Sequence, residues 1–148
     1  MQRHGWTLLF HECLIEQLLK VERACSHVMS HNPEATAHAN IKLFRALSRL
    51  ILETIPRDPG SDAYRQGNTM GPRFRHWRRA KIGRRFRLFF RFDFTAKVII
   101  FAWVNDERTL RCAGGRNDPY AVFQKMLQRG NPPDSWDSLL AASRDDWK

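Results

Sequence analysis

The sequence has no acidic residue between Ala63 and Phe92, and this absence points to a kind of partner. The 148-residue chain has 15 acidic residues, all outside this stretch, against 25 lysines and arginines. Ten of the cations lie inside it and nine of them are Arg, so the formal net charge of +10 is concentrated there. Because a guanidinium matches phosphate oxygens two at a time and stacks on rings, the first partner to consider is a polyanion.

Long apolar runs are also missing. The longest, Val98–Val104, is far shorter than the roughly 20 residues of a membrane-spanning helix. The apolar run near the N-terminus ends at His11, and no small-residue cleavage site of a signal peptide follows it. The three cysteines include no CxxC pair, which is typical of a reducing compartment. These absences predict a cytoplasmic protein.

Metal-ligand patterns are scarce. His27 and His31 lie four positions apart on an expected helix, with Cys25 nearby, so a shared metal is one interpretation. Solvated helix histidines are the interpretation we prefer, since no second pair of ligands stands at zinc spacing. We therefore expect neither a metal nor a cofactor.

The first half of the chain predicts a strand and two helices within a single domain, residues 1–148. Trp6 to Phe10 is a short apolar run typical of a strand. Apolar residues then recur at three and four positions, which predicts a helix from about Glu12 to Met29. A second helix is expected with Asn32 as N-cap and Pro33 in its first position, with Ala37 on its apolar stripe, until Pro56 ends it. Two long consecutive helices should pack as an antiparallel hairpin.

The second half predicts three antiparallel strands followed by helices. The strands are expected at residues 77–82, 85–94 and 97–105, and the third is apolar on both faces, as in a central strand. Asp118 and Pro119 then predict a helix start, and a short helix follows near Trp136. The fold class is therefore α+β: a small antiparallel sheet with an N-terminal helical hairpin and C-terminal helices on one face.

Alternation predicts what the two faces of the sheet carry. Phe86, Leu88, Phe90, Phe92 and Phe94 should share one face of the second strand. Six residues should lie on the face that the helices leave open, together with Phe89: Trp77, Arg79, Lys81, Arg85, Arg87 and Arg91. Aromatic rings among arginines suit a single strand of RNA whose bases stack, so Trp77, Arg79, Arg85, Phe89 and Arg91 are the candidate RNA-binding residues. The alternative is a solvated face whose charges protect the sheet from aggregation.

Cutting RNA without metal needs a group for the ribose 2′-OH, cations for the phosphorane and a proton for the 5′-oxygen. Lys81, the only lysine of the basic stretch, and Arg87, central on its strand, are candidates. Residues that follow the central strand are further candidates: Glu107, Arg108 and Arg111. Two residues have two open interpretations. His76 is either a loop histidine or a general base, and Tyr120 either packs its helix or takes part in the chemistry.

Several segments together resemble one known family. They are Gly5-Trp6 with His11, Arg85-Phe-Arg-Leu-Phe-Phe-Arg-Phe92, Lys97 to Arg111, Asp118 to Leu127, and Arg129-Gly-Asn-Pro-Pro133 with Trp136. They closely resemble the YhaV toxins over nearly the whole chain. The resemblance implies a RelE-like fold and metal-independent mRNA cleavage that arrests translation, often on the ribosome. It also implies neutralisation by a PrlF-type antitoxin, a swapped-hairpin DNA-binding protein that would bring the pair to operator DNA.

The resemblance also implies roles for residues. RelE-like enzymes use basic residues of the sheet and a late tyrosine, which on this chain implies Arg79, Lys81 and Arg87, then Arg108 or Arg111. Tyr120 is the nearest match to the late tyrosine, although it lies further along the chain, at a helix start. We therefore expect an endoribonuclease toxin, and the alternative is a non-catalytic module that binds RNA or the ribosome.

Overall fold

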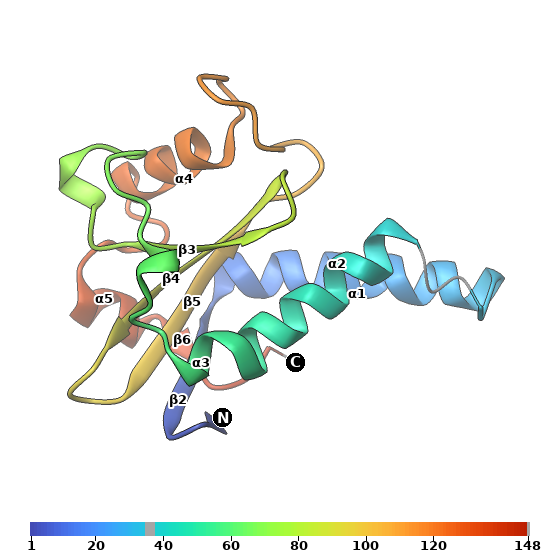
Figure 1. Ribbon diagram of the computed structural model, residues 1–148, viewed down its shortest axis with the longest axis horizontal. Coiled ribbons are helices and arrows are strands. Elements are labelled where there is room, and N and C mark those ends of the chain that lie inside the picture. Colours follow the sequence, from blue (N-terminus) through green and yellow to red (C-terminus); the bar gives the residue numbers. More distant parts are fainter. Residues whose placement is uncertain (35–37, 148) are drawn as a thin grey trace.

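The computed structural model describes residues 1–34 and 38–147. Its elements follow in chain order: β1 (Gln2–Arg3), β2 (Trp6–His11), α1 (Glu12–His31), α2 (Ala39–Arg49), a π-helical segment (Leu50–Thr54), α3 (Ile55–Arg57), β3 (Arg78–Ile82), β4 (Phe86–Asp93), β5 (Val98–Val104), α4 (Pro119–Gln128), α5 (Trp136–Ala141) and β6 (Ser143–Arg144). The α+β class predicted from the sequence is confirmed (Figure 1).

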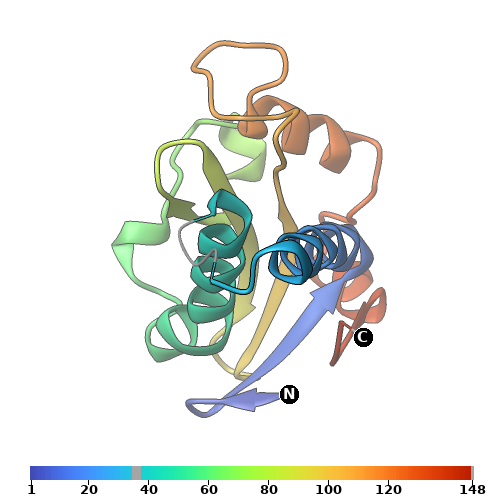
Figure 2. The same ribbon diagram turned by 90° about the vertical axis from the view of Figure 1, so that its right-hand side faces the viewer.

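The helical hairpin is present, but its second helix begins later than predicted. The Asn32 N–H donates to the Val28 carbonyl and so ends α1, while the Asn32 side chain accepts a hydrogen bond from the Glu34 N–H. The α2 helix begins after His38, whose Nδ1 accepts from Asn40 N at 3.1 Å. Asn32 is therefore not an N-cap, and the predicted stripe position Ala37 falls outside the described residues. Figure 2 shows α1 and α2 paired on one side of the molecule.

The chain from Ala39 to Arg57 continues helically through the π-helical segment. A π-type hydrogen bond from the Ile55 N–H to the Leu50 carbonyl carries it into the last turn. Pro56 lies in that turn, and the helix ends one residue later at Arg57. The sequence therefore located this end correctly, because proline removes a helix donor and cannot continue the helix.

The three predicted strands match β3, β4 and β5 within one residue at each end. The central position of β5 is also confirmed, since the strand order is β1-β2-β5-β4-β3. One feature of the predicted sheet is wrong: β2 pairs with β5 in parallel, from Thr7 opposite Val98 to Phe10 opposite Phe101, so the sheet is mixed. The direction of β2 depends on a partner some 90 positions away, about which the local pattern carries no information.

Helices cover both faces of the sheet, not one (Figure 1). The α1 and α2 side buries Leu8, Phe10, Leu88, Phe90 and Phe101. A second core under α4 and α5 contains Trp77, Phe89, Ile100, Phe123 and Leu139. The prediction that the helices occupy one face is therefore wrong, because the apolar side chains of α4 and α5 need a partner and find it on the second apolar face of β5.

Candidate active site

Three elements converge on the hydroxyl of Tyr120, in the first turn of α4. Arg79 of β3 donates to this hydroxyl from Nε at 2.8 Å, and Arg87 of β4 donates from Nε at 3.2 Å. Tyr120 is 5% exposed, and its ring packs edge-on against Phe89 at 5.6 Å between centroids. The tyrosine thus packs its helix and also holds two guanidinium groups, so the two interpretations of Tyr120 are not exclusive.

Arg87 is buried and its guanidinium is hydrogen-bonded, although the sequence predicted an exposed position. Its Nη1 donates to the carbonyls of Phe86 at 2.8 Å and Arg84 at 3.2 Å, and only 6% of the residue is exposed. Asn105, the first residue after β5, accepts from the Arg87 N–H at 2.7 Å through its side-chain Oδ1. The alternation placed Arg87 on the correct face, but α4 covers that face. The expectation that Arg87 is solvent-exposed is therefore wrong, and its guanidinium is fixed by the fold.

Arg111 completes this group of side chains. Its guanidinium lies 4.9 Å from the centroid of the Tyr120 ring, and its Nη1 donates to Asp118 Oδ1 at 2.5 Å. The Arg111 N–H donates to the Arg85 carbonyl at 3.0 Å, which joins the loop after β5 to the β3–β4 turn. We refer to Arg79, Arg87, Arg111 and Tyr120 as the arginine–tyrosine cluster.

Asp118 has two functions in this arrangement. It is the N-cap of α4, as predicted, and its Oδ2 accepts from the Tyr120 N–H at 3.1 Å. Its Oδ1 also accepts from the Cys112 N–H at 2.8 Å, in addition to Arg111. The sequence predicted only the cap. Asp118 and Asn105 were missed as residues that position arginines, since their arginine partners come from elsewhere in the chain.

The other late arginine does not reach the cluster. Arg108 is exposed on the turn after β5, where its N–H donates to Asp106 Oδ1 at 3.0 Å. Across residues 1–34 and 38–147, its side chain makes no hydrogen bond or ion pair with the cluster. Of the two candidates for the late arginine, the structure brings Arg111 and not Arg108 to Tyr120.

Lys81 and Arg85 are exposed, at the end of the sheet where the arginine–tyrosine cluster lies. Lys81 lies directly opposite Arg87 in the β3–β4 register, which puts neighbouring side chains about 5 Å apart at Cβ. Arg84 and Arg85 form the exposed turn between these strands. These cations therefore lie next to the cluster with side chains accessible to a polyanion.

Two predicted base-stacking residues are buried. Trp77 and Phe89 are both 0% exposed. The Phe89 ring stacks on Phe123 of α4 at 4.3 Å, and Trp77 Nε1 donates to Asp134 Oδ1 at 2.8 Å. The prediction that these rings lie on an open face is wrong, because α4 and α5 cover them, and neither ring is accessible to an RNA base.

Arg91 has a packing role in the structure. Its guanidinium lies 5.7 Å from the ring centroid of Trp77 and 5.5 Å from that of Trp136, and its Nη1 donates to the Asp134 carbonyl. Burial lowers the pKa of Arg91 below its ordinary range, and the nearby Asp134 charge opposes this effect. His76 pairs with the Asp134 carboxylate at 2.7 Å. Both residues tie the segment before α5 to the sheet, at the opposite end of β3 from Lys81.

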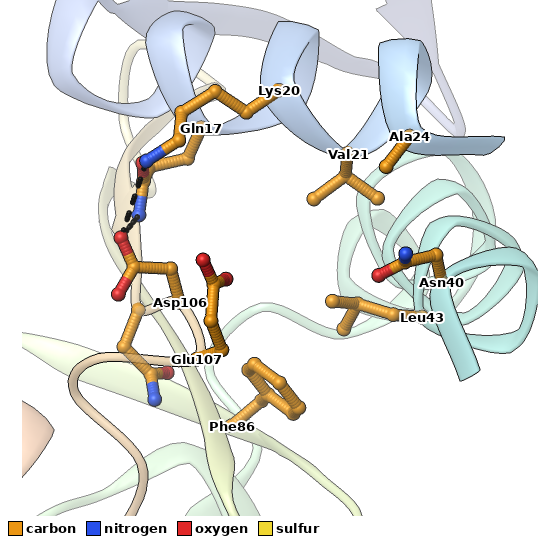
Figure 3. A pocket seen from close by; sticks show the side chains of 10 residues that line it. Gln17, Lys20, Val21, Ala24, Asn40, Leu43, Phe86, Asp106 and Glu107 are labelled. Carbon is orange, nitrogen blue, oxygen red and sulfur yellow. Dashed lines mark hydrogen bonds and ion pairs between the residues drawn. The ribbon is translucent and has the colours of Figure 1, made fainter. Parts of the chain in front are cut away.

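A different hollow lies on the α1 and α2 side of the sheet (Figure 3). It has a volume of about 410 Å³ and is lined by Val21, Leu43, Phe86 and the carboxylates of Asp106 and Glu107. Burial would raise the pKa of Asp106, but hydrogen bonds from Arg108 N, Gln17, Lys20 and Thr109 outweigh it, and the pKa is lowered. Glu107 thus points into this acidic hollow and does not join the cluster.

The candidate metal ligands on α1 point to different partners. The His27 and His31 rings are 4.5 Å apart, and His31 Nδ1 hydrogen-bonds to the His27 carbonyl at 2.9 Å. The Cys25 thiol instead donates to the Asn40 carbonyl on α2. In the part of the chain that the structure describes, no group of three or more His, Cys, Asp or Glu side chains could hold a metal ion.

Among the same residues, no helix is both long and apolar enough to cross a membrane.

Comparison with known proteins defines the class to which this fold and cluster belong. Residues 8–144 match a family described as toxins with endonuclease activity, of toxin-antitoxin systems. That family is YhaV, and the chain belongs to it. Two relatives in Escherichia coli, "Ribonuclease toxin YhaV" of strain K12 and "Toxin YhaV" of O6:H1, are each 40% identical over 139 residues, covering 92% of this chain and 90% of theirs. No solved structure matches the chain.

Proposed function

We propose that this protein is an endoribonuclease toxin that cuts single-stranded mRNA in the cytoplasm by attack of the ribose 2′-OH, without a metal ion. The observation that carries the proposal is the convergence of Arg79, Arg87 and Arg111 on Tyr120. Two guanidinium groups at the hydroxyl and a third over the ring offer positive charge and a transferable proton at one site. The name of the K12 relative, a ribonuclease toxin, supports RNA as the substrate.

In the proposed reaction the 2′-oxygen attacks the adjacent phosphorus. The P–O2′ bond forms and the P–O5′ bond breaks, which leaves a 2′,3′-cyclic phosphate on one product and a 5′-hydroxyl on the other. The 2′-OH proton leaves to a base, and the departing 5′-oxygen takes a proton from an acid. Negative charge accumulates on the equatorial oxygens of the phosphorane between these two events.

Arg87 and Arg111 are the proposed stabilisers of that charge. The bonds of Arg87 to two carbonyls and to Tyr120 fix its guanidinium before substrate arrives. A preorganised donor of this kind needs no reorganisation at the moment of reaction, and removing one such donor typically costs a factor of about 10² to 10³ in rate. The bond from Arg111 to Asp118 orients the second guanidinium in the same way.

Tyr120 is the proposed proton donor to the 5′-oxygen. Arg79 and Arg87 both donate to the hydroxyl oxygen and occupy its acceptor sites, so its own hydrogen is left to donate elsewhere. Lys81, opposite Arg87, supplies either a charge that positions the 2′-OH or the group that accepts its proton. Arg84 and Arg85, on the exposed turn beside the cluster, would bind the flanking phosphates.

The antitoxin is the second proposed partner, since the family belongs to toxin-antitoxin systems. We propose a PrlF-type antitoxin that neutralises the toxin by covering the exposed cations Lys81, Arg84 and Arg85. Operator DNA would be bound only through this partner. The ribosome is a further proposed partner, as the place where mRNA is presented.

The proposal is tested with purified protein and end-labelled RNA in EDTA, with and without ribosomes. We expect cleavage in EDTA, with 2′,3′-cyclic phosphate ends. Cleavage only when ribosomes are present would mean that the ribosome presents the mRNA to the toxin. Tight RNA binding with no cleavage in either condition would favour the alternative, a non-catalytic RNA-binding module.

A further inference from the structure

A separate hollow opens beside Tyr120, on the side of the sheet away from the hollow in Figure 3. Its volume is about 330 Å³, near the lower end of the roughly 300 to 1,000 Å³ of small-molecule sites. Its walls come from three segments of the chain: Thr69 before β3, the loop from Arg111 to Asp118, and Tyr120 with Gln124 on α4. The hollow thus has room for one flat group rather than for a long ligand.

The hollow shares two residues with the arginine–tyrosine cluster. Arg111 and Tyr120 line it, and their guanidinium and ring stack with 4.9 Å between the guanidinium carbon and the ring centroid. A phosphate bound at the cluster would therefore hold its own nucleotide or the next one at the mouth of this hollow. Guanidinium planes and aromatic rings are the surfaces on which proteins stack unpaired RNA bases.

Gln124 supplies the group that would recognise such a base. It stands four positions after Tyr120, so the two side chains project from the same side of α4. The side chain is half-buried, and its amide makes no hydrogen bond to any residue in the ranges 1–34 and 38–147. The donor and acceptor of this amide are therefore available to a ligand that enters the hollow.

Two glycines of the loop, Gly114 and Gly115, also line the hollow. At Gly115 an added Cβ would lie 3.0 Å from the Cys112 carbonyl oxygen, so a side chain there would strain the loop that carries Arg111. Gly114 has a φ of +78°, which favours glycine and lets the loop turn across the hollow. Gly114 and Gly115 therefore add no side chains to the lining of the hollow.

We propose that this hollow is a nucleobase subsite that takes an adenine next to the scissile phosphate, with the Gln124 amide bound to its edge. The inference rests on the proposed function. Adenine presents an amino donor beside a ring nitrogen acceptor, and this pair matches a glutamine amide in two hydrogen bonds. The edge proposed is the one formed by the 6-amino group and N7 of adenine. Guanine presents two acceptors at that edge, and the pyrimidines have no N7, so neither makes the same pair there.

The test is the sequence preference of cleavage, measured on RNA with randomised positions. Gln124→Met keeps the length of the side chain and removes its hydrogen bonds, and Gln128→Met makes the same change at an exposed position one turn further along α4. We expect wild type and Gln128→Met to cut with adenine enriched at one position beside the cleaved bond, and Gln124→Met to reduce this enrichment about tenfold. An unchanged preference in Gln124→Met would overturn the subsite and leave the proposed function standing.

A binding measurement covers the case in which no RNA is cut. Short 2′-O-methyl oligonucleotides, identical except for one A, G, C or U, cannot be cleaved by 2′-OH attack. We expect the wild type to bind the adenine oligonucleotide about tenfold more tightly than the others, and Gln124→Met to bind all four alike. Equal affinities in the wild type would refute the subsite whether or not the protein is a nuclease, and a preference for adenine without cleavage would refute only the nuclease.

Discussion

The Nε of Arg87 donates to the hydroxyl of Tyr120 at 3.2 Å, which links β4 to the first turn of α4. Arg79 makes the same contact from the neighbouring strand at 2.8 Å. The two bonds place two cations at one oxygen, where repulsion between them opposes their approach unless the fold holds both. Phe123 of α4 packs against Phe89 and Trp77, and this contact holds the helix that carries Tyr120 on the sheet.

The first prediction separates the two late arginines. Arg111→Ala should slow RNA cleavage about 10²-fold, because it removes one stabiliser of the phosphorane. Arg108→Ala removes the same charge from an exposed turn outside the cluster, so its cleavage rate should stay close to wild type. Single-turnover rates with saturating enzyme are the measurement. Equal losses in the two variants would show that only net charge matters at this end of the sheet.

The second prediction concerns salt. Four cations in or beside the arginine–tyrosine cluster are exposed or partly exposed and so accessible to phosphate: Lys81, Arg84, Arg85 and Arg111. If each displaces about 0.7 of a counterion from a single strand, the slope of log K against log salt should be about −3. Fluorescence anisotropy with a non-cleavable oligonucleotide gives this slope. A slope near zero would mean that these four cations do not bind RNA.

Sequence patterns located the strands but not what covers them. The apolar run of β5 predicted a central strand, and the alternation in β4 predicted correctly that Phe89 and Arg87 share a face. Phe89 was interpreted as a base-stacking ring because it stands among arginines. The signal against that interpretation was β5 itself, since a strand that is apolar on both faces needs a cover on both.

The sequence could predict only part of the arginine–tyrosine cluster, because local patterns do not show which distant segments come together. Arg79 and Arg87 follow from alternation in two adjacent strands, which is local information. The choice of Arg111 over Arg108 depends on where the loop after β5 crosses the β3–β4 turn, and that path is fixed by contacts with Asp118 and the Arg85 carbonyl. No pattern in the sequence places those contacts.

The third prediction is that stability falls in mild acid because of His11. Burial lowers the pKa of His11 below its ordinary value of about 6.5, and the charge of Glu12 partly opposes this effect. The unfolded chain therefore binds a proton near pH 6.5 that the folded chain does not, so stability is full above this pH and is lost as the pH falls further. Protonation would also remove the Nδ1 acceptor that caps α1 at the Cys13 N–H.

His11→Asn tests this assignment, because asparagine is a good N-cap and does not titrate. Melting temperatures measured between about pH 7 and pH 5 should fall less in the variant than in wild type. Parallel curves for the two proteins would assign the acid sensitivity to another group.

The fourth prediction concerns inhibition by the antitoxin. Changing both Arg84 and Arg85 to Glu should weaken RNA binding about tenfold or more and weaken antitoxin binding to a smaller extent, because both ligands are proposed to meet this turn. Arg91, which we first expected in this surface, is a poor choice for the test, since its guanidinium packs between Trp77 and Trp136.

Glu107→Lys provides the comparison, because Glu107 lies in the acidic hollow on the other side of the sheet (Figure 3). Affinities for the antitoxin are measured by titration calorimetry. One combination of results would contradict direct occlusion: the variant at Arg84 and Arg85 loses RNA binding but keeps wild-type affinity for the antitoxin, and Glu107→Lys loses affinity for the antitoxin. The antitoxin would then dock on the helical hairpin.

The central claim, that Arg87 and Tyr120 act as one catalytic unit, is tested most directly by single-turnover cleavage rates of wild type, Arg87→Lys, Tyr120→Phe and the double variant. Tyr120→Phe keeps the ring that packs on Phe89 and removes only the hydroxyl, and Arg87→Lys keeps the charge and removes the Nε donor. We predict that each single change slows cleavage about 10²-fold and that the double variant is little slower than either, since one broken contact disables both groups. Losses that multiply in the double variant, or a wild-type rate in Tyr120→Phe, would contradict the account.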